Sequence, residues 1–241
     1  MISFSKGRYW AAEAHSQADI EAAQTLRTQA FGMLDYDADA YDARCAHILI
    51  RQRSDNRLVC CFRMLPLRGG EIRQSYSAQY YELSALETFD GPMVEMGRFC
   101  VDPEVSDADI LRVAWAAMTE YVDRNGVQLL FGCSSFSGIE TDAYLDAFAV
   151  LKARHLAPKR WLPRVKAPDV FRFAALLRRR PDLRKAKLRM PPLLKTYLIM
   201  GGWVSDHAVV DRQMNTLHVF TGLEVGAIPD GRKRLLRAVV G

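Results

Sequence analysis

Charged and hydroxylic side chains interrupt three apolar stretches that have the character of strands. Arg63 interrupts the first stretch, Glu95 and Arg98 interrupt the second, and Ser134 and Ser135 close the third. A carboxylate among apolar residues costs free energy unless it is paired, and its pKa rises there, which makes it a usable general base. A buried Glu–Arg ion pair with a purely structural role explains the same residues. On the residues alone, both interpretations stay open.

Other kinds of active site find less support in the sequence. The five histidines (15, 47, 155, 207 and 218) show no i, i+4 pair and no H-E-x-x-H motif, so we expect no metal. The absence of a G-x-S-x-G motif disfavours a hydrolase triad. Cys133 stands in an apolar strand, where a cysteine is more often a small core residue than a nucleophile.

An acidic stretch at 34–42 admits two interpretations. It contains four closely spaced aspartates, namely Asp35, Asp37, Asp39 and Asp42. Together they are able to bind a cationic substrate, or they form an exposed turn. Turn chemistry alone favours the exposed turn.

The elements that must position these residues follow from periodicity and from turn residues. Helical spacing predicts a helix over 17–31 and a second, nearly all-apolar helix over 110–122, with Ser106 as its N-cap. The loop 54–57 is suited to a hairpin. We further predict strands at 46–53, 58–65, 93–101 and 127–133, and a helix at 140–153.

This order of elements indicates an α/β fold, in the α+β sense of a central mixed sheet flanked by helices. A right-handed crossover through the long helix makes strands 93–101 and 127–133 parallel neighbours. Strand alternation places Glu95 and Gly97 on one face and Arg98 on the other, unless a bulge near Gly97 re-aims the chain.

Composition limits the class of protein. With 241 residues, 49% of them hydrophobic and 25% charged, the chain is typical of a globular protein, and we expect one domain over 1–241. Five cysteines without a C-x-x-C pair disfavour disulfides and structural zinc. No apolar stretch reaches the ~18 residues of a membrane span, and no secretory signal is visible, so we expect a cytoplasmic location.

Positive charge is concentrated in one part of the chain. Residues 152–195 contain fifteen Lys and Arg against two Asp, a net charge of +13; the whole chain carries +5, so the remainder carries −8. Such a segment favours an acidic partner: an anionic membrane surface, an acidic protein or, more weakly, nucleic acid. The candidate contact residues are Arg178, Arg179, Arg180, Arg184 and Lys185.

The same segment suggests a short interfacial helix. Residues 170–180 join apolar side chains to an arginine run, as in a helix that lies on a membrane with its arginines near lipid phosphates, and Pro181 allows a break after it. A solvated helix face accounts for these residues equally well.

Two motifs resemble a known family. The residues at 63–66 and 95–101 match the R-x-x-P … E-x-x-R-F-x-V pattern of the autoinducer (acyl-homoserine lactone) synthases, whose fold is related to GCN5-type N-acetyltransferases. The fuller similarity, over most of residues 17–225, is to the L-ornithine N-alpha-acyltransferases of bacterial ornithine-lipid synthesis. It includes the segments 21–31, 76–84, 130–136, 190–198 and 215–220.

This resemblance implies a reaction. A 3-hydroxyacyl group would pass from acyl carrier protein to the alpha-amino group of ornithine, giving lyso-ornithine lipid. The acyl group arrives on the carrier's phosphopantetheine, and no metal or tightly bound cofactor is implied. Glu95 would take a proton from the amine, through a water. Arg98 would hold the geometry or bind a carboxylate or phosphate, and Arg63 would bind the amino-acid carboxylate by two hydrogen bonds.

The resemblance also suggests further substrate contacts. Backbone N–H groups near Phe99 and Cys100 would polarise the thioester carbonyl. Either Asp35 or Asp42 would accept ornithine's side-chain ammonium. Ser134 and Ser135 mark the polar end of the neighbouring strand, and we include them among the substrate-binding candidates.

One departure from the wider acetyltransferase pattern concerns the acyl donor. The glycine-containing loop that binds the pyrophosphate of coenzyme A is replaced at 102–107 by an acidic stretch without glycine. Such a helix N-terminus is a poor anion site. This favours an acyl carrier protein, whose acidity the basic segment 152–195 would attract.

Alternative functions remain. The same chemistry on another amino acid such as glutamine, or lactone formation from S-adenosylmethionine, is compatible with these motifs. A catalytically silent module that docks on a membrane or carrier protein through its basic segment is the non-enzymatic alternative. In each case the protein would lie in the cytoplasm or on the inner face of the bacterial membrane.

Overall fold

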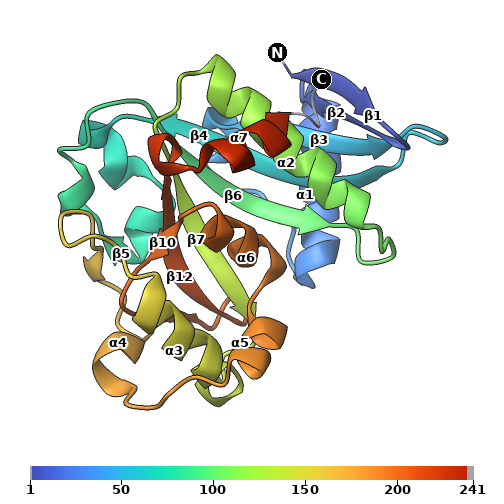
Figure 1. The fold of residues 1–241 in the computed structure, drawn as a ribbon. Coiled ribbons are helices and arrows are strands. Elements are labelled where there is room, and N and C mark those ends of the chain that lie inside the picture. The colour runs from blue at the N-terminus through green and yellow to red at the C-terminus, as the bar shows by residue number, and fades with distance from the viewer. Residues whose placement is uncertain (1, 238–241) are drawn as a thin grey trace. The chain divides into compact units, whose positions relative to one another are not determined.

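The computed structural model describes residues 2–237, which form two compact units (Figure 1). Unit 1 is built from Met1–Pro66, Val94–Val127 and Pro229–Gly241, and unit 2 from Leu67–Met93 and Gln128–Ile228. The expectation of one domain over 1–241 stays a prediction.

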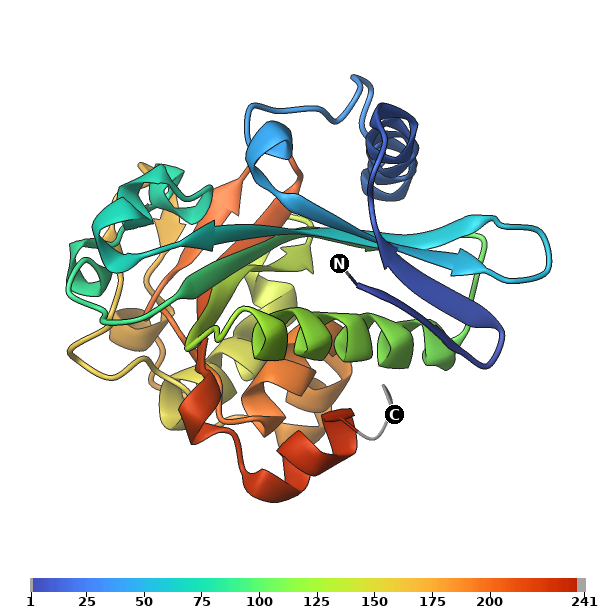
Figure 2. The ribbon, with the colours of Figure 1, turned by 90° about the horizontal axis from the view of Figure 1, so that it is seen from above.

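Unit 1 is a sheet with one helix on each face. Its strand order is β1-β2-β3-β4-β6, and the first three of these pairings are antiparallel. Figure 2 shows α1 on one face of these strands and α2 on the other. The bounds are β1 (Ser3–Lys6), β2 (Tyr9–Glu13), α1 (Gln17–Phe31), β3 (Ala46–Gln52), β4 (Leu58–Leu67), β6 (Met93–Val101), α2 (Ala108–Arg124) and α7 (Asp230–Arg237).

The ends of α1 and α2 follow from their capping residues. Ser16 accepts a hydrogen bond from the Asp19 backbone N–H at 3.2 Å, and Gly32, with φ 62°, ends α1, which confirms the predicted helix over 17–31. The predicted N-cap of α2 is wrong. Asp107, not Ser106, caps this helix, because its carboxylate accepts the Asp109 N–H at 3.0 Å.

Unit 2 has its own run of paired strands and its own helices. Its strand order is β7-β12-β11-β9, β10 also pairs with β12, and β5 pairs with β8 apart from this sheet. The strands are β5 (Tyr81–Glu82), β7 (Leu129–Ser137), β8 (Arg164–Val165), β9 (Val170–Phe171), β10 (Trp203–Val204), β11 (Ala208–Asp211) and β12 (Thr216–Glu224). The helices are α3 (Leu145–Arg154), α4 (Phe173–Leu176), α5 (Leu183–Arg189) and α6 (Pro192–Ile199).

Short 3-10 helices complete both units. In unit 1 there is η1 (Asp42–Arg44), directly after the acidic stretch. Those of unit 2 are η2 (Gly69–Gln74), η3 (Ser77–Gln79), η4 (Ser84–Leu86), η5 (Thr141–Tyr144) and η6 (Val225–Ala227).

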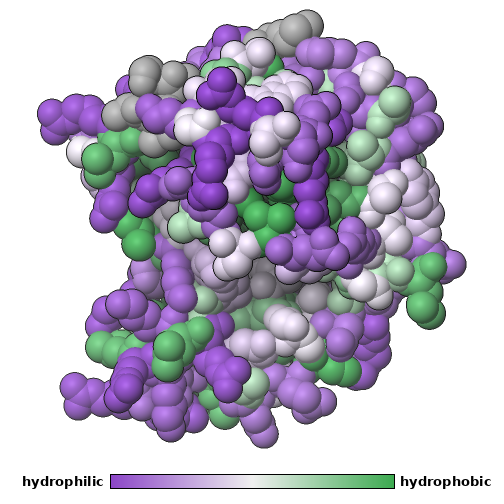
Figure 3. Space-filling view, turned by 90° about the vertical axis from the view of Figure 1, so that its right-hand side faces the viewer, coloured by the Kyte–Doolittle hydropathy of each residue, from purple (hydrophilic) through white to green (hydrophobic). Residues whose placement is uncertain are grey.

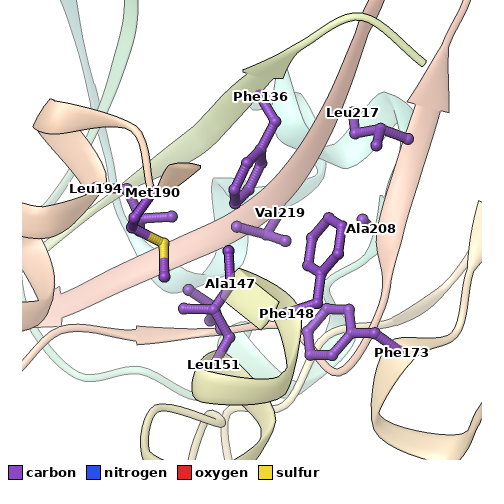
Figure 4. Close-up of a cluster of buried hydrophobic side chains, with 11 residues drawn as sticks. Phe136, Ala147, Phe148, Leu151, Phe173, Met190, Leu194, Ala208, Leu217 and Val219 are labelled. Carbon is purple, nitrogen blue, oxygen red and sulfur yellow. The ribbon is translucent and has the colours of Figure 1, made fainter. Parts of the chain in front are cut away.

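An aromatic cluster forms the core of unit 2 (Figure 4). Phe148 of α3 stacks on Phe173 of α4 with ring centroids 5.2 Å apart, and it also contacts Phe136 of β7. Met190 and Leu194, at the end of α5 and in α6, close the cluster. The core therefore fixes α4, α5 and α6, which carry part of the basic segment 152–195.

This core corrects the predicted interfacial helix over 170–180. Val170 and Phe171 form β9, which pairs with β11, and α4 is a single turn that begins at the fully buried Phe173. Phe171 and Phe173 therefore pack in the core of unit 2, so these residues do not form a membrane-facing helix, whereas Leu176 stays exposed. The chain between residues 2 and 237 holds no helix long and apolar enough to cross a bilayer.

The remaining predicted elements are close to those observed. The strands at 46–53, 58–65 and 93–101 are confirmed as β3, β4 and β6. The strand predicted at 127–133 begins two residues later and runs to Ser137. The helix predicted at 140–153 begins as η5 and continues as α3.

Candidate active site

Three arginines and three aspartates form one ion-pair network in unit 1. The arginines come from α1, β4 and β6, and the aspartates come from the acidic stretch between α1 and β3. We call these six residues the arginine–aspartate cluster: Arg27, Arg63, Arg98, Asp37, Asp39 and Asp42.

Arg27 holds the acidic stretch against α1. Its side chain is 1% exposed, and it donates from Nε to Asp37 Oδ2 at 2.7 Å and from Nη1 to Asp42 Oδ1 at 2.8 Å. The Asp37 N–H in turn donates to Thr28 Oγ1 at 2.9 Å. The interpretation of the whole stretch as an exposed turn is therefore wrong, since Asp37 and Asp42 are buried and paired.

Arg63 binds Asp39 with both ends of its guanidinium. Nη1 lies 2.6 Å from Oδ1 and Nη2 lies 2.8 Å from Oδ2 of Asp39, and Nη1 also donates to Asp42 at 2.6 Å. The Tyr41 ring lies 5.5 Å from this guanidinium. A substrate carboxylate would have to exchange with Asp39 to bind here, so the predicted role of Arg63 stays a prediction.

Arg98 joins the cluster because β6 is irregular at this residue. Its φ of 53° is left-handed, a conformation that costs an L-residue about 1–2 kcal/mol. A Cβ placed on Gly97 would lie 3.8 Å from Arg63 Nε, so Gly97 faces the cluster. Arg98 faces it too, with Nε 3.1 Å from Asp37 Oδ2, although simple alternation would turn it away.

Glu95 lies on this same side of β6. It is 4% exposed and precedes Gly97 by two residues, which puts both on one face of the strand. The half-buried Cys45 thiol feels the charges of Arg63, Glu95, Asp42 and Asp39. The predicted base therefore lies beside the cluster.

Burial and ion pairing set the protonation states in the cluster. Burial alone would raise the pKa of Asp42, but hydrogen bonds from Arg27 and Gln24 bring it well below its usual value. Burial opposes the charge of Asp39 as well, and its bonds with Arg63 lower its pKa. Both acids are therefore ionised at neutral pH.

Two uncharged groups border the cluster. Burial lowers the pKa of His47, whose Nε2 lies 2.9 Å from the Asp42 carbonyl oxygen. Because a carbonyl oxygen only accepts, Nε2 carries the proton. Burial raises the pKa of the Cys45 thiol to about 12, so this thiol stays protonated.

Other residues singled out from the sequence lie around or away from the cluster. Asp35 is exposed and outside it. The Phe99 ring stacks on Phe62 with centroids 5.6 Å apart. Cys100 is buried, with its Sγ 3.5 Å from Cys61 Sγ.

The remaining candidates belong to unit 2. Ser134 is buried and accepts a hydrogen bond from Thr221 at 2.9 Å, whereas Ser135 is exposed, as strand alternation requires. The candidate contact residues of the basic segment are exposed, namely Arg178, Arg179, Arg180, Arg184 and Lys185.

Sequence reasoning missed Arg27 as part of the site. The signal was present, since this arginine stands in the apolar stripe of α1, between Leu26 and Ala30. A charge on a buried helix face requires an opposite charge, and the acidic stretch that follows α1 offers four aspartates. Among residues 2–237, no group of three or more His, Cys, Asp or Glu is arranged to hold a metal ion.

The chain is similar to known acyltransferases. A family profile described as "Acetyltransferase (GNAT) domain" matches residues 21–116, which include the whole cluster and Glu95. The structure resembles that of FeeM, an N-acyl amino acid synthase from uncultured soil microbes, with a TM-score of 0.50 and 10% identity over 91% of this chain and 92% of that one. The predicted GCN5-type fold class, with a mixed sheet flanked by helices, is thereby confirmed.

Similarity of sequence is closer and extends along the chain. The L-ornithine N(alpha)-acyltransferase of Rhodobacter capsulatus is 30% identical over 90% of both chains. The enzyme of the same name from Rhizobium meliloti is 29% identical over 89% of this chain and 79% of its own. With its motifs at 63–66 and 95–101 gathered around one buried cluster and a match of this extent, the chain belongs to the L-ornithine N(alpha)-acyltransferase family.

Proposed function

We propose that this protein transfers a 3-hydroxyacyl group from acyl carrier protein to the alpha-amino group of L-ornithine and so makes lyso-ornithine lipid. The names of its relatives support ornithine as the acceptor. The observation that carries the chemistry is the buried Glu95, on the same face of β6 as Gly97, the residue that faces Arg63.

The reaction needs a base because the amine arrives protonated. In this proposal Glu95 takes that proton through a water, and the freed nitrogen lone pair attacks the thioester carbonyl carbon. Backbone N–H groups near Phe99 and Cys100, next to the irregular Arg98, stabilise the oxyanion. The C–N bond forms, the C–S bond breaks, and the phosphopantetheine thiol leaves with a proton.

Exposure within the cluster suggests how the amino acid binds. The Arg63 side chain is 4% exposed, against 13% for Arg98 and 23% for Asp39. We therefore assign the ornithine carboxylate to Arg98 and the side-chain ammonium of ornithine to Asp39, with Arg63 holding Asp39 in place. Asp42 is less suited to the ammonium, because Arg27, Arg63 and Gln24 already occupy its oxygens.

The start of α2 supports a carrier protein as donor. Asp107 caps this helix with its own carboxylate and binds Arg8 at 2.5 Å and the Tyr9 hydroxyl at 2.6 Å. The negative charge there opposes a pyrophosphate, the group by which coenzyme A would bind a helix N-terminus. We propose phosphopantetheine on the carrier protein as the acyl handle, with no tightly bound cofactor.

The test is a matrix of donors and acceptors with the purified full chain. Donors are 3-hydroxyacyl–carrier protein and 3-hydroxyacyl–coenzyme A; acceptors are ornithine, glutamine and S-adenosylmethionine, with products identified by mass spectrometry. We expect an alpha-amide of ornithine, formed faster from the carrier protein. A glutamine amide or a lactone as main product would overturn the acceptor. No turnover with any pair would favour the non-enzymatic docking module.

A further inference from the structure

Exposed leucines alternate with cations along one edge of unit 2. Leu176 at the end of α4 is 64% exposed, and Leu188 in α5 is 74% exposed. Figure 3 shows hydrophobic residues set among hydrophilic ones on the lower part of the surface in that view. We call six exposed residues of this edge the basic leucine surface: Leu176, Leu183, Leu188, Arg180, Arg184 and Lys185.

The orientation of α5 turns Arg184 and Leu188 away from the core. Ala186 and Met190, one turn apart, are buried, and Met190 belongs to the aromatic cluster of unit 2. Arg184 and Leu188 stand two residues on either side of Ala186, which at 100° per residue places both on the opposite face. Packing within unit 2 therefore does not use Leu188.

The segment between α4 and α5 is held firmly in place. Lys152 of α3 donates to the Leu177 carbonyl at 2.7 Å, and Asp146 of α3 accepts the Asp182 N–H at 2.9 Å. Arg179 pairs with the same Asp146 at 2.9 Å. These contacts order the backbone that carries the surface, so binding to it costs little further ordering.

The cations of the surface lack acidic partners in the protein. Within the described range 2–237, Arg180, Arg184 and Lys185 form no ion pair, while residues 152–195 carry a net +13. Single exposed leucines are ordinary, but three of them within thirteen residues, interleaved with unpaired cations, form a composite surface. Anionic headgroups over hydrocarbon match both components at once.

We propose that the basic leucine surface binds an anionic lipid bilayer, with Leu176 and Leu188 inserted between headgroups and the cations on lipid phosphates. An acidic protein would also pair with the cations, but the exposed leucines favour a bilayer because its hydrocarbon can bury them. The biological role of this binding rests on the proposed function, since the product, an acylated amino acid, is an amphiphile that partitions into membranes. The binding itself requires no turnover.

The test is co-sedimentation of the full chain with vesicles. One set contains phosphatidylcholine alone, and the other contains phosphatidylcholine with phosphatidylglycerol at about 2:1, which gives a negative surface potential. We expect binding only to the anionic set, weakened by salt. The double variants L176S/L188S and R184E/K185E should each lower the partition coefficient about 10-fold or more. L34S and R112E, at residues that are also exposed but lie in unit 1, are the controls.

Three outcomes overturn this proposal. In the first, wild-type protein sediments with neither vesicle set; in the second, the leucine variant binds as wild type does. Alternatively, R184E/K185E lowers kcat/KM for carrier-protein thioester while L176S/L188S leaves it and vesicle binding unchanged, which would assign the surface to the carrier protein. Because sedimentation needs no substrate, the vesicle-binding result can be interpreted even if the acyl-transfer assay shows no product.

Discussion

Arg63 and Asp39 form a two-pronged ion pair, with hydrogen bonds of 2.6 and 2.8 Å, in the cluster beside Glu95, the proposed base. Arg63→Lys keeps the charge but loses the planar fork. We expect kcat/KM for ornithine to fall at least about 10-fold, because a bond to a charged group is worth roughly 1.5–3 kcal/mol. Steady-state kinetics with varied ornithine measures this. Arg57→Lys, a partly exposed arginine of unit 1 paired with Glu104, should change little.

Replacing Glu95 separates a base from a structural carboxylate. Glu95→Gln keeps the shape and removes the proton acceptor, so turnover should fall about 100- to 10,000-fold with KM little changed. Glu104→Gln, at an exposed glutamate of the same unit, is the matched control. Loss of only severalfold, with an unchanged circular dichroism spectrum, would remove Glu95 as the base.

The buried pairing of Asp42 makes an acid-dependent contribution to stability. Its pKa in the folded state lies below the usual 3.8, so below pH ~4 the unfolded chain binds more protons, and stability rises with pH through that range. Asp42→Asn should cost about 3–5 kcal/mol at pH 7, since it strands buried arginines, and should flatten this dependence. Urea unfolding at pH 3 to 7 measures both.

An exposed pair provides the comparison for Asp42. Asp109→Asn breaks the exposed pair with Arg112 and should cost at most about 1 kcal/mol. Equal losses in the two variants would show that burial does not set the strength of the cluster.

His218 makes the stability depend on pH in a higher range than Asp42 does, for a different reason. Burial lowers its pKa from 6.5 to about 4, so between these values the unfolded chain takes up a proton that the folded chain refuses. Stability should fall by about 3 kcal/mol as the pH drops from 6.5 to 4. The slope should become shallower in His218→Phe, with the remainder coming from other buried histidines such as His47, and should be unchanged in His15→Gln, an exposed control.

The tautomer of His218 is a second, independent measurement. The Tyr81 hydroxyl donates to the His218 carbonyl at 2.8 Å, so the 3.1 Å contact with Nδ1 requires the ring to donate from Nδ1. Nitrogen-15 spectra at pH 5.5 should show a neutral ring protonated at Nδ1. A ring that is half protonated near pH 6.5 would contradict both statements.

The long, strongly patterned elements of this fold were predictable. The helix over 17–31 and strand β6 appear with the bounds that their apolar spacing and caps indicate. The interfacial helix suggested at 170–180 was wrong, because an apolar run beside arginines fits a membrane helix and a buried strand equally well. Only the pairing of β9 with β11 decides, and that depends on residues some forty positions away.

The site was predictable in its residue types but not in its contacts. The motif identified Arg63, Glu95 and Arg98, yet alternation along β6 gave Arg98 the wrong face, because nothing local requires the left-handed turn at that residue. The interpretation of the acidic stretch as an exposed turn was wrong because the residue that buries it lies outside the stretch. Its partner, Arg27, lies on a helix whose buried face shows only after packing.

The divided make-up of unit 1 has a consequence for synthesis on the ribosome. Helix α2 and its partner α7 are joined through the ion pair between Asp123 and Arg237, with N–O distances of 2.9 and 3.0 Å, yet all of residues 128–228 lie between them. At about 5–20 residues per second, these roughly 100 residues take on the order of 5–20 s to translate. During that interval the side of α2 that α7 later covers is exposed on the nascent chain. We therefore expect a ribosome-associated chaperone to bind this helix.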